Sequence, residues 1–419
     1  MLLVKNALYL GAPVDLVVKD DRILTMTPAG HCQYPEAGEV VEARGLMLLP
    51  ALIDCHTHLR EPGHEYKEDI ESGLAAAACG GFGAVMCMAN TSPVNDEAAV
   101  AILMQERARA THPFGPRLFP VAAATVGLGG EEMAPLAALK EAGCVAVSND
   151  GKPIANTEIV RRIMEYAADL GMILIDHCED PWLAKGWVMH EGALSGRMGL
   201  KGQPAPGEAI QAARDIMLAD YLDLPIHIAH VSSAMTCDII AWGKSRGTRV
   251  TAETCPHYLL LDESSVSGYN PLAKVSPPLR SPSDRAALRK AVRDGVIDIL
   301  ATDHAPHAWH EKNDTLDRAP FGFVGLELAL PLSFQLVGQG VFDERRLHDL
   351  WCDRPAEIFG LPCNRFDPGD EASFILYDPQ EKWEVRPENL QSKSRNTPFL
   401  GMTLRGRVKA LWLAGKRLF

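Results

Sequence analysis

What this 419-residue sequence lacks excludes several classes of protein. No uninterrupted apolar stretch approaches the ~20 residues that cross a bilayer, and no basic and apolar leader with a small-residue cleavage site opens the chain. The ten cysteines never occur as Cys-x-x-Cys, which argues against a zinc finger and against a disulfide framework. We therefore expect a cytoplasmic protein with reduced thiols and no membrane partner.

The chain also contains fewer basic than acidic residues. Lys and Arg number 41 against 54 Asp and Glu, for a formal net charge of -13. A nucleic-acid partner would require a basic patch, so we expect none. The hydrophobic fraction of 47% and charged fraction of 23% are those of an ordinary globular chain with a large core.

From about residue 45 to 305, short apolar runs alternate with longer amphipathic stretches. Continuously apolar runs indicate buried parallel strands. Strand and helix repeated eight times predict an α/β fold, a (β/α)8 TIM-type barrel. A doubly wound open sheet is the alternative, but no Gly-rich phosphate turn follows Cys55. The expected strands are Leu46 to Cys55, Phe82 to Ala89, Arg117 to Ala124, Cys144 to Ser148, Met172 to Ile175, Pro225 to Ala229, Arg249 to Ala252 and Ile297 to Ala301; four expected helices are Glu97 to Thr111, Asn156 to Leu170, Pro206 to Asp223 and Ser283 to Asp294.

The two ends of the chain differ from its middle. Both contain short alternating strands, including Ser373 to Tyr377, Thr403 to Arg407 and Val408 to Leu413, and neither end alone is long enough for a stable sheet. We predict that residues 1–45 pair with 365–419 in one small composite β domain beside a barrel of residues 46–364. The prolyl, charged stretch Asp303 to Ala319 is expected to be a mobile loop over the barrel mouth.

Polar residues follow most of the expected strands. Catalytic groups of such barrels gather at the carboxyl ends of the strands, so these side chains would face one bowl. His56 and His58 are two residues apart and share one face of an extended strand. The residues at the strand ends are His56, His58, Asn90, Asp150, His177, His230 and Asp303.

Nitrogen and carboxylate ligands without thiolate suit zinc, with iron or manganese as alternatives. Zinc lowers the pKa of bound water to about 7 and polarises carbonyls, which suits amide hydrolysis. Asp303 is the expected acid/base residue. The competing interpretations are core histidines for His177 and His230, and a turn residue for Asp150, since Asn149-Asp150-Gly151 is also a good turn sequence.

Two stretches carry a resemblance to a known family. Asp54 to Gly63 (DCHTHLREPG) is similar to the D-x-H-x-H-L-R-E-P-G motif of bacterial type I dihydroorotases, in the amidohydrolase superfamily. Ala301 to His307 (ATDHAPH) resembles that family's second motif. The resemblance extends over essentially the whole chain, and it implies a dihydroorotase that interconverts dihydroorotate and N-carbamoyl-aspartate in pyrimidine biosynthesis.

The resemblance also implies individual roles. His56 and His58 would hold a first zinc ion, Asp150 would bridge, and His177 and His230 would hold a second. Whether the site binds one ion or two is left open. Asp303 would be ligand and acid/base together. Arg60, Asn90 and His307 would grip the substrate carboxylate, although Arg60 could instead form a salt bridge at the barrel mouth. Phe321 and Gly322 would touch the ring through backbone groups, or form a simple loop-to-helix turn.

The chain departs from the family pattern at two places. Asp150 stands where many superfamily members carry a carboxylated lysine. Ser276, before Pro277-Pro278, stands where the family usually has asparagine. Serine has a shorter side chain without an amide, so its contact with the substrate would be weaker or mediated by water.

Two other functions compete with this one. An allantoinase or hydantoinase would act on a cyclic ureide that lacks the carboxylate for which Arg60 is suited. A catalytically inactive scaffold for aspartate carbamoyltransferase would lack the metal histidines, all of which are present here. The partners we expect are a small-molecule substrate, further copies of the chain in a homo-oligomer, and a complex with aspartate carbamoyltransferase.

Overall fold

The computed structural model describes residues 1–31 and 38–419. Its larger part is a parallel eight-stranded sheet in the order β15-β14-β13-β10-β9-β8-β7-β6. A parallel bridge from Thr57 to His304, with the His58 N–H donating to the His304 carbonyl at 2.8 Å, joins the two edges and closes the barrel. The strands are β6 (Leu52–Thr57), β7 (Phe82–Cys87), β8 (Arg117–Ala123), β9 (Ala146–Ser148), β10 (Leu174–Asp176), β13 (Ile226–Ile228), β14 (Val250–Thr254) and β15 (Ile299–Leu300).

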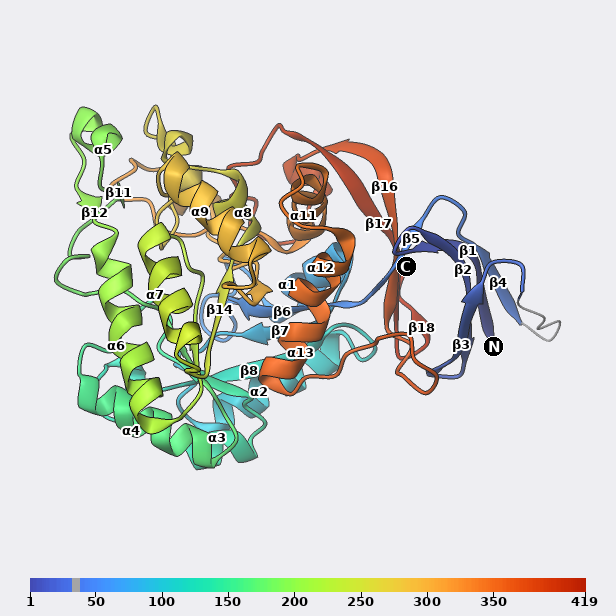
Figure 1. Cartoon of the computed structure of the whole chain (residues 1–419), viewed down its shortest axis with the longest axis horizontal. Coiled ribbons are helices and arrows are strands. Elements are labelled where there is room, and N and C mark those ends of the chain that lie inside the picture. Colours follow the sequence, from blue (N-terminus) through green and yellow to red (C-terminus); the bar gives the residue numbers. More distant parts are fainter. Residues whose placement is uncertain (32–37) are drawn as a thin grey trace.

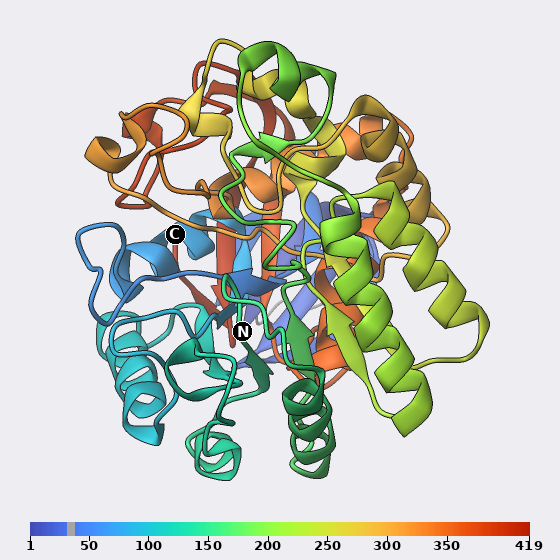
Figure 2. The ribbon, with the colours of Figure 1, turned by 90° about the vertical axis from the view of Figure 1, so that its left-hand side faces the viewer.

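Helices surround this barrel (Figures 1 and 2). Asn156 caps α4 as expected, because its side chain accepts the Glu158 N–H at 3.0 Å. The helices are α1 (Ile70–Gly80), α2 (Ala98–Thr111), α3 (Leu136–Glu141), α4 (Thr157–Asp169), α5 (Ala193–Met198), α6 (Pro206–Leu222), α7 (Ala234–Ser245), α8 (Pro256–Leu260), α9 (Pro282–Arg293), α10 (Trp309–Lys312), α11 (Ala329–Gly338), α12 (Glu344–His348) and α13 (Arg354–Phe359). Among the described residues, none of these helices is long and apolar enough to cross a membrane.

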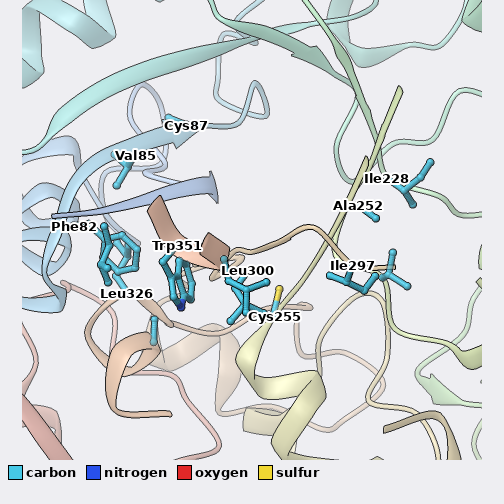
Figure 3. Packing of buried hydrophobic residues seen from close by; sticks show 14 of the residues in the cluster. Phe82, Val85, Cys87, Ile228, Ala252, Cys255, Ile297, Leu300, Leu326 and Trp351 are labelled. Atoms are coloured by element: carbon cyan, nitrogen blue, oxygen red, sulfur yellow. The ribbon is translucent and has the colours of Figure 1, made fainter. Parts of the chain in front are cut away.

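Two apolar layers hold the barrel together, one on each face of its strands. Side chains that point inward, such as Ala84 and Met86 of β7, form an interior cluster. Their neighbours Val85 and Cys87 point outward and pack under the helices, in the layer where Trp351 meets the ring of Phe82 edge-on (Figure 3). Both faces of the strands are therefore apolar, which explains the unbroken apolar runs of the sequence.

The ends of the chain form the second sheet, in which β1 (Leu2–Tyr9), β2 (Ala12–Lys19), β3 (Arg22–Pro28), β4 (Glu39–Glu42) and β5 (Met47–Pro50) join β16 (Phe374–Glu384), β17 (Thr403–Leu413) and β18 (Lys416–Arg417). Figure 1 shows this sheet beside the barrel, with both termini in it. The pairing of the two ends into one β domain is confirmed. Its exact division from the barrel stays a prediction, and residues 32–37 of the predicted domain lie outside the described residues.

The prediction of one strand from Leu46 to Cys55 is wrong. β5 pairs antiparallel with β16 in the terminal sheet, whereas β6 starts the barrel. The change of sheet follows Pro50, which lacks an N–H for a ladder: the Ala51 N–H donates to Ser373 and the Leu52 N–H to Gly81. Thr403 to Leu413, expected as two strands, is the single strand β17.

Two further elements lie at the carboxyl ends of the barrel strands. The short strands β11 (Met189–His190) and β12 (Gly202–Gln203) form a two-stranded sheet that the sequence did not suggest. The expected loop from Asp303 to Ala319 contains the short helix α10, whose last residue, Lys312, is fully buried. The mobility of this loop stays a prediction.

Candidate metal and substrate site

The predicted metal ligands come together at the carboxyl ends of the strands. His56 lies in β6 and His58 directly after it, while Asp150, His177, His230 and Asp303 follow β9, β10, β13 and β15. All six side chains are buried. His177 and His230 lie together, because His177 Nδ1 is 2.9 Å from His230 Nε2 and both imidazoles face Asp150; their role as metal ligands rather than core histidines stays a prediction.

The carboxylate of Asp150 is at the centre of the cluster. Its Oδ1 lies 3.4 Å from His56 Nε2, 3.4 Å from His177 Nδ1 and 3.3 Å from His230 Nε2. Its Oδ2 lies 3.4 Å from His58 Nε2. Asp303 Oδ1 lies 3.2 Å from His58 Nε2 and 3.8 Å from His56 Nε2, so both carboxylates face the same two imidazole nitrogens.

These separations fit a metal ion between the side chains. Two ligand atoms that are each about 2.0–2.1 Å from one tetrahedral ion lie about 3.3 Å from each other. His56 Nε2 is also completely buried and has no hydrogen-bond partner among the described residues, although it faces two carboxylates. Of the side-chain groups in the described residues that could hold an ion, two lie in this cluster: His56 with His58 and Asp303, and His56 with Asp150 and His230.

Opposite charges overcome the effect of burial on the carboxylates. Burial alone would raise the pKa of Asp150, but the imidazoles of His56, His177 and His230 hold it well below its usual value. Burial also opposes the ionisation of Asp303, yet the neighbouring imidazoles of His58 and His56 lower its pKa. Burial lowers the pKa of His58, whereas for His56 and His177 the neighbouring carboxylates overcome burial and raise the pKa, that of His177 to about 9. A bound metal ion would displace these protons, because imidazoles bind metals in the neutral form.

The backbone at this site is strained. Arg60, His230 and Asp303 have φ angles of 63°, 28° and 47°, values that side chains with a Cβ adopt only at a cost of about 1–3 kcal/mol each. Such conformations persist where the surroundings hold them and are concentrated at functional sites.

A cavity of about 370 Å³ opens above the cluster. The residues predicted to bind substrate all line it: Arg60, Asn90, Ser276, His307, Phe321 and Gly322. Arg60 Nη2 lies 3.4 Å from His307 Nε2, and that imidazole nitrogen donates to the Phe321 carbonyl at 2.7 Å. Among the described residues Arg60 has no carboxylate partner within ion-pair distance, which argues against its interpretation as a salt bridge at the barrel mouth.

Asn90 and Gly322 also shape the site itself. Asn90 Oδ1 lies 2.8 Å from His58 Nδ1 and accepts its proton, which turns His58 Nε2 towards the carboxylates. Gly322 has a φ of 115°, and a Cβ there would come within 2.6 Å of the Ala305 side chain. The loop over the cavity can therefore follow this path only with glycine.

The sequence did not reveal every residue of the site. Trp187 and Glu179 also line the cavity, joined by a 3.0 Å hydrogen bond from the indole, and the Trp187 ring lies 4.3 Å from that of Phe321. Glu253 in β14 lies behind His56, with Oε1 2.7 Å from His56 Nδ1. Trp187 and Glu179 belong to an irregular segment without periodicity, and nothing in the β14 sequence marks Glu253.

Comparisons with known proteins show the family to which the chain belongs. Residues 45–235 match the family model described as Dihydro-orotase-like. The dihydroorotase of Desulforapulum autotrophicum is 45% identical over 97% of this chain and 94% of its own length. That of Geobacter metallireducens is 46% identical over 92% of this chain and 90% of its own. The chain belongs to the dihydroorotase family.

Solved structures confirm the fold of this dihydroorotase family member. The L-hydantoinase of Arthrobacter aurescens superposes with a TM-score of 0.88 over 100% of this chain and 95% of that one, at 22% identity. The dihydropyrimidinase of Brevibacillus agri gives 0.80 over 99% and 94%, also at 22% identity. Because the sequence identity is this low, the similarity shows only that the fold is shared, a barrel with an extra β domain. It carries no conclusion about the substrate.

Proposed function

We propose that this protein is a zinc-dependent dihydroorotase, which reversibly hydrolyses the cyclic amide of dihydroorotate to N-carbamoyl-aspartate in pyrimidine biosynthesis. The observation that carries the proposal is one cavity that holds both the His and Asp cluster and three polar side chains suited to a carboxylate: Arg60, Asn90 and His307. An enzyme for a cyclic amide with a carboxylate needs both sets of groups in one place.

His56, His58, Asp150, His177, His230 and Asp303 would hold one or two zinc ions. Zinc supplies Lewis-acid chemistry, polarising a carbonyl and activating water. Asp303 is ionised and borders the cavity, so it accepts the proton of the attacking water at its carboxylate and returns it to the leaving amide nitrogen. In the reverse reaction the same carboxylate takes the proton from the ureido nitrogen.

The cavity wall would orient the substrate. The Arg60 guanidinium pairs with the substrate carboxylate, supported by His307 and the amide of Asn90. Phe321 and Gly322 present backbone groups to the ring, and Ser276 reaches it directly or through water. Hydantoin and allantoin lack the carboxylate and would leave the half-buried Arg60 charge without a partner.

The direct test is turnover by purified, zinc-loaded protein in both directions, followed by the interconversion of dihydroorotate and N-carbamoyl-aspartate. We expect both reactions to reach the same equilibrium mixture. Zinc-loaded protein that converts neither compound would contradict the proposal and favour the scaffold function.

Location and assembly are part of the same proposal. We propose a cytoplasmic enzyme that forms a homo-oligomer and associates with aspartate carbamoyltransferase. The cysteines of the described residues are all free thiols, as a reducing compartment requires. Mass measurement of the purified chain, alone and mixed with the transferase, tests both assemblies.

A further inference from the structure

We infer that Glu253 is a positioning residue that fixes two metal-binding histidines at once, His56 through its side chain and His230 through its backbone. The inference rests on the proposed function in that it needs a metal ion at His56. Glu253 does not line the cavity and does not face the metal cluster, so its role is to act through the histidines.

The contact with His56 sets the orientation of that imidazole. Glu253 Oε1 lies 2.7 Å from His56 Nδ1, and both side chains are fully buried. A carboxylate here accepts the Nδ1 proton, which leaves the lone pair on Nε2, the atom that faces Asp150 and Asp303. A hydrogen-bonded carboxylate behind a histidine ligand fixes the ring and makes it a stronger donor.

The contact with His230 reaches the other side of the cluster. The same Oε1 accepts the backbone N–H of His230 at 3.2 Å. His230 has a φ of 28°, a conformation that its surroundings must hold. The Val231 N–H also donates to the backbone carbonyl of Glu253 at 2.8 Å. Glu253 therefore accepts hydrogen bonds from the backbone of both His230 and Val231.

The second oxygen of Glu253 is also in use. Oε2 lies 3.3 Å from His227 Nε2, and the other nitrogen of His227 lies 2.8 Å from Thr251 Oγ1. His227 and Glu253 are fully buried inside the barrel, below the metal cluster. A chain of hydrogen bonds thus runs from Thr251 through His227 and Glu253 to His56, and it leaves the carboxylate no freedom to rotate.

An amide is not equivalent to this carboxylate. Glutamine can keep its oxygen on His56 and His230 only by donating its amide N–H to His227, which must then move its own proton to Nδ1, and it places no negative charge behind His56. Glu253→Gln should therefore weaken zinc binding by about 10–100-fold, the usual effect of losing such a partner. The d–d absorption spectrum of the cobalt-substituted protein should change as well, because the position of His56 is altered.

Asp298→Asn is the matched control. Asp298 is also a buried acid that hydrogen-bonds β14, through the Ala252 N–H at 2.9 Å, but its other side-chain partners are Lys244 and Arg354 rather than histidines. We expect this variant to keep the zinc affinity and cobalt spectrum of the parent. Equal losses in both variants would mean that a buried carboxylate near β14 serves general stability, and would overturn the inference.

A pair of substitutions at His227 keeps the inference testable if Glu253→Gln does not fold. Glutamine can place a donor where His227 Nε2 now lies, whereas phenylalanine keeps the ring without a donor. His227→Phe should weaken zinc binding several-fold, and His227→Gln should restore most of it. Equal affinities for the two variants would contradict the chain of hydrogen bonds.

These measurements separate the inference from the proposed function. Zinc affinity, measured by competition with a chelator, and the cobalt spectrum need no substrate. Unchanged affinity and spectrum in Glu253→Gln overturn the inference even if the parent protein hydrolyses dihydroorotate. Lost affinity supports it even if the parent acts on a different cyclic amide.

Discussion

At the scale of single residues, the sequence predicts the parts of the site that lie next to strand ends. His56, His58, Asp150, His177, His230 and Asp303 were found because each follows an apolar run, and the structure brings them together. Glu253 was not found because it lies inside a strand, where an acidic residue has no pattern to identify it. Its role becomes visible only when β6 and β14 are placed around the same barrel interior.

Asp303 carries the prediction about proton transfer. Asp303→Asn cannot take up the proton, so we expect turnover to fall by about 10²–10⁴-fold in both directions. Initial rates from dihydroorotate and from N-carbamoyl-aspartate measure this, with zinc content determined on the same samples. Near-normal rates in either direction would show that another residue is the acid/base.

Arg60 carries the prediction about the substrate carboxylate. A hydrogen bond to a charged group contributes about 1.5–3 kcal/mol, so we expect Arg60→Met to raise KM by about 10–100-fold. The effect should be much smaller on kcat, because the guanidinium does not take part in proton transfer. An unchanged KM would contradict the carboxylate assignment.

At the scale of elements, the barrel strands were predictable and the structures that join them were not. The unbroken run from Leu46 to Cys55 contains a change of sheet at Pro50, which hydrophobicity alone does not reveal because β5 and β6 are both buried. The segments around β11 and α10 have no clear periodicity, and their positions depend on contacts between distant parts of the chain.

Lys312, the last residue of α10, connects the chain at Lys274 with the loop at Pro320. Its buried ammonium donates to the Lys274 carbonyl at 3.2 Å and to the Pro320 carbonyl at 2.9 Å, and the Lys274 carbonyl also accepts the Gly322 N–H. Lys312→Met removes both donations and frees the loop that carries Phe321 and Gly322. We expect a several-fold rise in KM with zinc content unchanged. If KM stays at the parent value, the loop is held by other contacts.

At the scale of the whole molecule, the terminal sheet and the metal site are joined through one short stretch of chain. β5 is tied to β16 in the composite sheet and continues, after Ala51, into β6, which carries His56. The sequence predicted the pairing of the two ends because neither could form a sheet alone. The order of the strands in that sheet depends on long-range pairing, which local patterns do not encode.

Metal removal tests this coupling between site and fold. A ligand that binds only the folded state stabilises it by about 2.7 kcal/mol when present at 100 times its Kd. We therefore expect a chelator to lower the Tm of the protein and added zinc to restore it. A Tm that is the same in chelator and in zinc would contradict a metal held by residues of several strands.

The central claim is that this barrel is a metal-dependent hydrolase for a cyclic amide that carries a carboxylate. The most direct test is to measure the turnover of dihydroorotate, hydantoin and allantoin by one purified sample whose zinc content is also determined. We predict one or two zinc ions per chain and a strong preference for dihydroorotate. Zinc-loaded protein that prefers hydantoin or allantoin would contradict the role of Arg60, Asn90 and His307.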